Sequence, residues 1–147
     1  MGGTWTHTSQ LSLLAELWWD GHAPSDAQWD DWASHNGQLM TLATLGAPPT
    51  AVAGNLAWQA EIFNTSTNLR RGNIYWRLSW QNDAWQPALD ILYTPADHGK
   101  ILTGSLTWQG DRLQVQGGLR THGGPNNAVV AQLPTRRLAY MALTWAF

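Results

Sequence analysis

The chain has 147 residues, enough for one domain, and eight Lys and Arg against ten Asp and Glu give it a formal net charge of −2. This balance, with no basic stripe, excludes the usual kind of nucleic-acid binder, and the absence of cysteine excludes disulfides and thiolate metal sites. Charged residues make up 12% of the chain, about half the usual share for a soluble domain, whereas eleven residues are tryptophan.

Along most of the chain apolar residues recur at every second position, which is the period of a β-strand. Most of these segments are close to the roughly 9–11 residues with which a tilted strand crosses a bilayer. No run of 18 or more apolar residues and no signal peptide is visible, and the helix-like stretch 25–34 lies in a connection. The alternation is weakest around Leu39 to Leu42. The eight predicted strands are 4–20, 38–46, 51–64, 72–82, 84–94, 100–109, 111–121 and 135–147.

The alternation gives each strand one apolar face and one polar face. In 100–109, for example, Leu102 and Leu106 alternate with Thr103 and Ser105. Long connections at 21–37, 64–72, 94–100 and 121–134 alternate with short ones at 46–50, 82–84 and 109–111. Outer-membrane barrels show this asymmetry, with long loops outside and tight periplasmic turns. The sequence therefore predicts an all-β fold, a transmembrane antiparallel up-and-down barrel forming one domain over 1–147, with both termini periplasmic.

Aromatic residues cluster at both ends of the predicted strands, on the apolar face. Such belts mark the two membrane–water interfaces of a transmembrane barrel. Those at the short-connection ends are Trp5, Trp80, Trp85, Trp108, Trp145 and Phe147, and those at the long-connection ends are Trp19 and Tyr93.

The last strand ends in Phe147, preceded at alternate positions by Trp145, Leu143, Met141 and Ala139. This pattern resembles the C-terminal signal of Gram-negative bacterial outer-membrane proteins. The size of the chain is similar to that of the small eight-stranded barrels of the outer-membrane protein A and protein X type. The resemblance implies an integral outer-membrane protein that the barrel-assembly machinery recognises through residues 135–147. Its partners would be the lipid bilayer and lipopolysaccharide.

Charged and amide side chains on the predicted inward face would fill an eight-stranded barrel, which is just wide enough to hold them. We expect a structural network of ion pairs and hydrogen bonds there, and a structural or interaction role for the protein. A narrow polar path for small solutes is the open alternative. The network comprises Glu16, Gln59, Glu61, Tyr75, Arg77, Asp90, Arg112, Gln114, Gln116 and Arg120.

Other polar residues suggest further sites. His7-x-Ser9 resembles the His-x-Ser pair of the outer-membrane lipid A deacylase, which implies a Ser9 nucleophile with His7 as its base. Polar residues at a membrane interface are the simpler explanation of the pair, and we expect no enzyme. No pair among the loop histidines has metal-ligand spacing, so we expect no metal and no cofactor. Lipopolysaccharide phosphates could bind Arg70, Arg71, Arg136 and Arg137.

Three other interpretations of the sequence remain open, and under any of them the chain could form a homo-oligomer. The chain could be the C-terminal part of a larger porin-like transport barrel, in which case the first strand pairs with a partner other than the last. It could be a lipid-modifying enzyme built on His7 and Ser9. A soluble, Trp-rich sugar-binding sandwich would place its tryptophans in loops, whereas most of them lie within strands.

Overall fold

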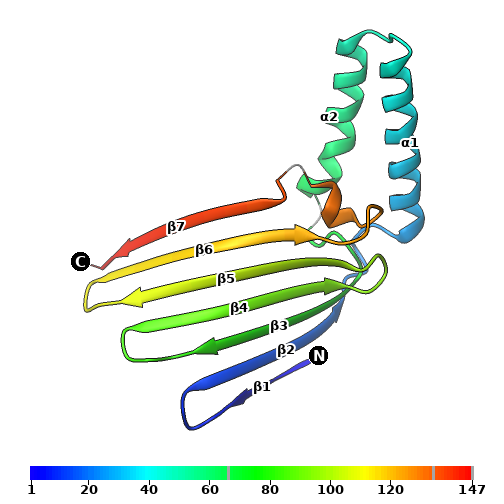
Figure 1. Cartoon of the computed structure of the whole chain (residues 1–147). Helices are drawn as coiled ribbons and strands as arrows, with labels where there is room; N and C mark the ends of the chain where they lie inside the picture. Colours follow the sequence, from blue (N-terminus) through cyan, green and yellow to red (C-terminus); the bar gives the residue numbers. More distant parts are fainter. Residues whose placement is uncertain (66, 134, 147) are drawn as a thin grey trace. The chain divides into compact units, whose positions relative to one another are not determined.

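The computed structural model describes residues 1–65, 67–133 and 135–146, apart from the side chains of 60 and 62–65. The chain divides into two compact units, one formed by Met1–Trp19 and Gly72–Phe147 and the other by Asp20–Arg71. The first unit is a β-sheet and the second is a pair of helices (Figure 1).

The sheet has seven strands in chain order, each antiparallel to the next (Figure 1). No pairing joins the first strand to the last within the described residues, so the sheet is open. The antiparallel up-and-down arrangement is therefore confirmed, in seven strands. They are β1 (Gly2–Thr6), β2 (Leu11–Trp19), β3 (Gly72–Trp80), β4 (Trp85–Thr94), β5 (Gly99–Gln109), β6 (Leu113–Gly123) and β7 (Arg137–Trp145).

The segment 4–20, predicted as one strand, is a hairpin of β1 and β2. The turn is closed by backbone hydrogen bonds from the His7 N–H to the Leu11 carbonyl (2.8 Å) and from the Gln10 N–H to the His7 carbonyl (2.9 Å). Gln10 has a φ of 64°, in the left-handed region that tight turns require. The polar run from His7 to Gln10 is the turn signal that the prediction passed over. Because of this extra reversal, the chain starts at the long-connection end, and the prediction that both termini lie at the short-connection end is wrong.

The segments 38–46 and 51–64, also predicted as strands, are helical. The first lies in the end of α1 (Asp26–Thr44) and the loop after it, and the second lies within α2 (Pro49–Thr65). Ser25 caps α1: its Oγ accepts from the Gln28 N–H, and Gln28 Oε1 accepts from the Ser25 N–H. Among the described residues no helix is both long and apolar enough to cross a membrane.

Helix-forming signals outweighed the period-two pattern in this region. Gly46, with a φ of 87°, ends α1, and the Ala47 N–H bonds back to the Leu42 carbonyl at 3.0 Å. Pro49 stands at the first position of α2, where its fixed φ suits a helix. The alternation in 51–64 is shallow, because small alanine residues occur at both parities and alanine is the best helix former.

The remaining five strands lie within two residues of their predicted ends. The sheet has tight turns at 7–10, 81–84 and 110–112 on one side, whereas 20–71, 95–98 and 124–136 connect strands on the other. The last of these connections contains the short 3₁₀ helix η1 (Val129–Gln132), whose Val129 and Val130 are buried. The predicted C-terminal Phe147 lies outside the described residues.

Candidate functional site

The register of the sheet sorts its side chains onto two faces of opposite character. One row across the strands pairs Leu78 with Leu89, Leu89 with Gly104, and Gly104 with Leu119. The neighbouring row, whose side chains point to the opposite face, pairs Arg77 with Asp90, Asp90 with Thr103, and Thr103 with Arg120. The two faces predicted from the alternation therefore exist as continuous surfaces across β2 to β7.

The apolar face is exposed across the whole width of the sheet. Leu119 is 69% exposed and Met141, at the middle of β7, is 79% exposed. Monomeric soluble proteins rarely expose contiguous apolar patches larger than a few hundred Å². The large exposed apolar residues on this face are Trp5, Leu13, Leu17, Trp19, Trp76, Leu78, Trp80, Trp85, Leu89, Leu102, Leu106, Leu119, Met141, Leu143 and Trp145.

The tryptophans of this face gather at the ends of its strands. Trp80 and Trp85 flank one tight turn, Trp85 pairs with Trp108, and Trp145 pairs with Leu113 beside the next turn. Trp5 lies near the β1–β2 turn. At the long-connection ends lie Trp19 of β2, paired with Gly72, and Tyr93 of β4, paired with Lys100. The described members of the two predicted belts thus lie at two heights of the apolar face, with aliphatic residues and Trp76 between them.

The polar face contains a cluster centred on Asp90. Its Oδ1 accepts a hydrogen bond from the Tyr75 hydroxyl and pairs with Arg77 NH1 at 3.0 Å. On the next strands, Arg120 Nε donates to Thr103 Oγ1 at 3.0 Å. Thr103 is 4% exposed, so this face buries a hydroxyl where the other exposes leucines. Thr103 and Asp90 thus find hydrogen-bond partners on neighbouring strands, as buried polar groups must, whereas Arg77 and Arg120 are still partly open to solvent.

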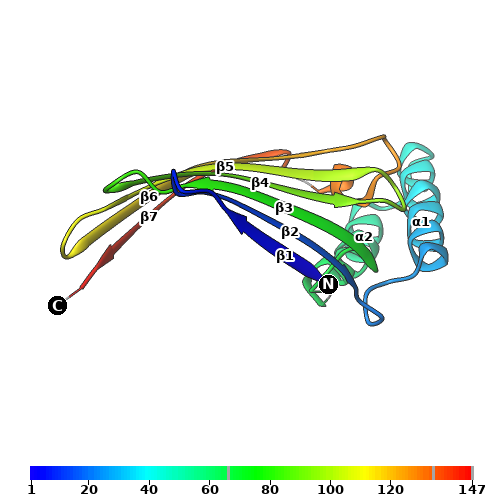
Figure 2. The ribbon, with the colours of Figure 1, turned by 90° about the horizontal axis from the view of Figure 1, so that it is seen from below.

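The cluster lines a hollow of about 380 Å³. Its walls come from β2 to β7, which shows that the sheet curves with the polar face on the concave side; Figure 2 shows the curvature. Of the predicted network, Tyr75, Arg77, Asp90, Gln116 and Arg120 meet here. Four further residues that the predicted network lacks line the hollow, although their parity in the sequence places them on this face: Trp18, Thr103, Ser105 and Tyr140.

The other members of the predicted network lie elsewhere. Glu16 pairs with Tyr75 in the register and shares the face, and Gln114 lies on the same face near the tight turn. Arg112 belongs to the turn between β5 and β6. Gln59 and Glu61 are on α2, and their assignment to an inward strand face is wrong, because the segment that carries them is helical.

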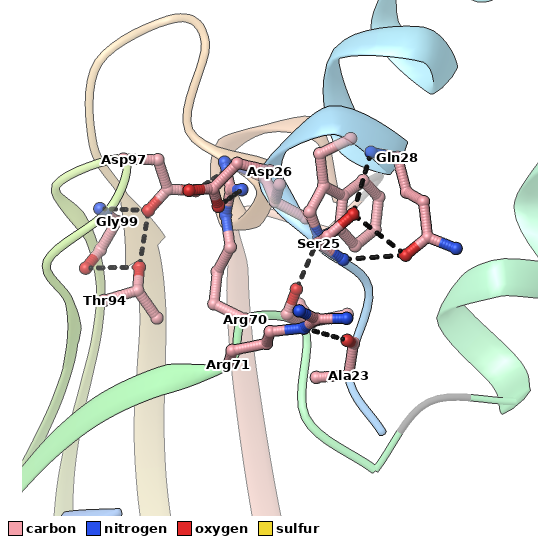
Figure 3. A network of polar contacts seen from close by, with 12 residues as sticks. Ala23, Ser25, Asp26, Gln28, Arg70, Arg71, Thr94, Asp97 and Gly99 are labelled. Carbon is pink, nitrogen blue, oxygen red and sulfur yellow. Dashed lines mark hydrogen bonds and ion pairs between the residues drawn. The ribbon is translucent and has the colours of Figure 1, made fainter. Parts of the chain in front are cut away.

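A buried carboxylate organises the long-connection end of the sheet. Asp97, 3% exposed, accepts at Oδ1 from the Thr94 hydroxyl (2.6 Å) and the Gly99 N–H (3.0 Å), and at Oδ2 from the Val129 N–H (2.8 Å) (Figure 3). It thereby holds the start of η1 against the β4–β5 turn. Gly99 allows the close approach, because a Cβ there would lie 2.6 Å from the Thr94 hydroxyl.

The helical unit has a conventional small core. Trp29, 2% exposed, donates its indole N–H to the Leu69 carbonyl at 2.7 Å. Arg70 is buried over the Trp29 ring and pairs with Asp26 at 2.9 Å, and Arg71 donates to the Ala23 carbonyl (Figure 3). Hydrogen bonds from the Asn68 amide and then the His22 N–H lower the pKa of Asp20. Of the four arginines predicted to meet phosphates, Arg136 and Arg137 are exposed.

A hollow of about 640 Å³ lies between the two helices and is lined by Gln28, Asp31, Trp32, His35, Trp58, Gln59 and Glu61. Trp32 donates its indole N–H to the Gln59 carbonyl at 3.0 Å and so joins the helices. No cluster of three or more metal-ligating side chains occurs among the described residues.

The structure brings His7 and Ser9 together in the β1–β2 turn. His7 Nδ1 lies 2.9 Å from Ser9 Oγ and accepts from the Ser9 N–H at 3.2 Å. Within the described part of the chain no carboxylate contacts His7 to orient it, as a catalytic triad would require. The contact closes a local turn, and both side chains are exposed.

No family model, curated protein or solved structure matches the chain.

Proposed function

We propose that this chain builds seven strands of the wall of an integral outer-membrane β-barrel, with the apolar face toward lipid and the polar face toward the interior. One observation carries the proposal: the sheet exposes Met141 and most of its leucines and tryptophans, and it buries Thr103, Thr107 and Asn73. This is the reverse of burial in water, where apolar side chains drive folding by leaving the solvent. With hydrocarbon around the apolar face, exposed apolar side chains and buried polar side chains are both expected.

The dimensions of the sheet support the same conclusion. The strands β2 to β7 have 9 to 11 residues each, the length that spans the hydrocarbon core at the tilt of barrel strands. Tryptophan prefers the interface on both sides of that core, where its ring lies in apolar surroundings and its N–H reaches water. The Trp80 indole N–H donates to the Ser9 carbonyl in the adjacent turn at 2.9 Å, which places its polar edge toward the turn.

The outer membrane, among membranes, is proposed from the end of the chain and its connections. The alternation through Ala139, Met141, Leu143 and Trp145 lies on the lipid face of β7, as a signal read by the barrel-assembly machinery requires. The exposed Arg136 and Arg137 lie at the long-connection end, where lipopolysaccharide phosphates would meet an outer-membrane barrel.

The proposal is tested by mixing the chain with phospholipid vesicles whose acyl chains carry bromine at defined depths, and by measuring flotation and tryptophan emission. We expect the protein to float with the vesicles and shallow bromines to quench more strongly than deep ones, because most apolar-face tryptophans lie near strand ends. Trp80→Phe should lower the quenched fraction, whereas Trp58→Phe, in the helical unit, should lower the unquenched fraction. Protein that stays in solution with unquenched emission would refute the proposal.

A second function, a porin-like passage for polar solutes, is favoured by the hollow on the concave face. Charged side chains of three strands, Arg77, Asp90 and Arg120, line it. In such a passage Arg120 would attract anions, so Arg120→Gln should reduce the anion-over-cation preference of channels in planar bilayers. If the completed barrel does not conduct, its interior is filled and the function is that of a structural wall.

A further inference from the structure

The two edges of the sheet lack most of the features that protect edges in water. Soluble sheets protect an exposed edge with a very short strand, lysine, proline, a bulge or a covering loop, and of these only the shortness of β1, five residues, is present. β1 reads Gly-Gly-Thr-Trp-Thr, and β7 contains neither lysine nor proline and pairs with β6 without a bulge. The outer side of each edge has no ladder partner among the described residues.

A bilayer makes these open edges costly. Each backbone N–H or C=O left unpaired in hydrocarbon costs several kcal/mol, and membrane-spanning sheets therefore close into barrels. The face pattern also continues to both edges, since Trp5 on β1 and Met141 on β7 are exposed members of the apolar face. The edges are thus built to be continued by further strands of the same alternation.

Strand direction restricts what can continue them. In a sheet of seven antiparallel strands in chain order, β1 and β7 run in the same direction. Direct pairing of β7 with β1, within one chain or with a copy related by rotation about the barrel axis, would create a parallel ladder, whereas every ladder in the sheet is antiparallel. Antiparallel pairing of two β7 strands would place the long connections of the two copies on opposite sides of the bilayer, unlike outer-membrane barrels.

We propose that β1 and β7 are the two docking edges for one kind of partner: an antiparallel membrane β-sheet with an odd number of strands, whose outer strands both run opposite to β1 and β7. An odd partner added to seven strands gives an even total, as in bacterial single-chain outer-membrane barrels. A second copy of this chain does not fit. The inference rests on the proposed membrane function and adds the strand number and strand direction of the partner sheet that completes the barrel wall.

The experiment compares three chains in detergent micelles by gel mobility, unboiled and boiled, against a crosslinked ladder. The first is the chain itself. The second has one strand added before β1 through a flexible linker, made from residues 113–123, whose parent β6 runs opposite to β1. The third, the matched control, has two strands added through the same linker, made from the hairpin 99–123.

We expect a compact, heat-sensitive monomer band from the eight-stranded chain alone, and no such band from the seven-stranded and nine-stranded chains. A heat-sensitive monomer of the seven-stranded chain would overturn the inference, as would a heat-sensitive band at a multiple of its mass. Equal behaviour of the eight-stranded and nine-stranded chains would also overturn it. Vesicle quenching is measured for all three chains. No quenching in any of them refutes the proposed function, whereas equal quenching in all three refutes the inference alone.

Discussion

The sheet and the helical unit differ in whether their large apolar side chains form a core. In the helical unit Trp29 and Leu39 are buried, and the ends of α1 carry the caps that a helix in water needs, although Trp58 and Leu45 are exposed. In the sheet Thr103 is buried, whereas Leu119 and Met141 are exposed. The helical unit therefore has a small apolar core, and the apolar face of the sheet lies open.

On the proposed membrane function, two surroundings acting on one polypeptide account for this difference. Transfer from water into the protein interior is favourable for apolar groups, whereas in hydrocarbon this driving force nearly vanishes and an exposed polar group is costly instead. The helical unit is arranged for water, and we propose that the sheet is arranged for lipid. Substitutions that affect one unit and leave the other unchanged test this difference between the sheet and the helical unit.

The largest effect is expected from Trp29→Ala in the helical unit. Removing a buried indole leaves a cavity and an unpaired Leu69 carbonyl, and such substitutions cost about 3–5 kcal/mol. Hydrogen exchange should show faster exchange of the α1 amides, with β4 and β5 unchanged. Trp58→Ala, at an exposed tryptophan of the same unit, is the control and should leave α1 protection within a few tenths of a kcal/mol. Equal loss in both variants would contradict a Trp29 core.

In the sheet, Met141→Arg tests whether the apolar face is in contact with lipid or with water. At a position so exposed, water would tolerate arginine with an effect of at most about 0.5 kcal/mol. On the lipid face at mid-height, arginine costs about 2–4 kcal/mol, which corresponds to a loss of vesicle partitioning of roughly 30- to 1,000-fold. Ala142→Arg, one position along β7 on the polar face, is the matched control and should partition almost as the unchanged chain does. Flotation measures both variants.

A smaller effect is expected at the start of α1. Ser25→Ala removes the hydroxyl of the capping box and should destabilise the helical unit by about 1 kcal/mol, seen as a lower midpoint of its thermal transition. Ser34→Ala, at an exposed interior position of the same helix, should leave the midpoint unchanged or raise it slightly. Both variants should partition into vesicles alike, because neither changes the apolar face.

The smallest effect is the pH dependence of the helical unit through Asp20. Its pKa lies below the usual 3.8 in the folded chain, so its contribution to stability is complete above that value and is lost as the pH falls through the folded pKa. Asp20→Asn should flatten this acid limb in thermal unfolding between about pH 5 and pH 2. An unchanged acid limb would show that the hydrogen bonds from Asn68 and His22 do not stabilise the fold.

The sheet was largely predictable because apolar and polar residues alternate along its strands. β3 to β7 carry most of their leucine, isoleucine and tryptophan at one parity and mainly polar groups at the other, with Leu92, Ile101 and Leu138 as exceptions, so period and register agree. The same pattern places Tyr75, Arg77, Asp90 and Arg120 on one face from the sequence alone. The alternation alone did not assign Thr103 and Tyr140 to the polar cluster, because the neighbours of a hydroxyl group follow only from the register of the strands.

In the regions whose secondary structure was predicted wrongly, local sequence signals determine the structure, and the period of two does not. The capping pair Ser25 and Gln28, Gly46 as a helix end, and Pro49 as a helix start were all present in the sequence. In 4–20 the alternation passes through four polar residues without a change of phase, so the period alone does not show the turn. The error mattered, because one additional reversal changed the strand number from even to odd.

The central claim is that the two faces of the sheet meet different media, and site-directed spin labelling along β5 tests it most directly. The chain has no cysteine, so single cysteines at positions 101–108 take a nitroxide label without background. In vesicles we expect collision rates with dissolved oxygen to peak at 102, 104, 106 and 108, and rates with a water-soluble nickel chelate to follow the opposite phase on the polar face. Uniform access of the nickel chelate to both faces, with no period of two, would contradict the claim.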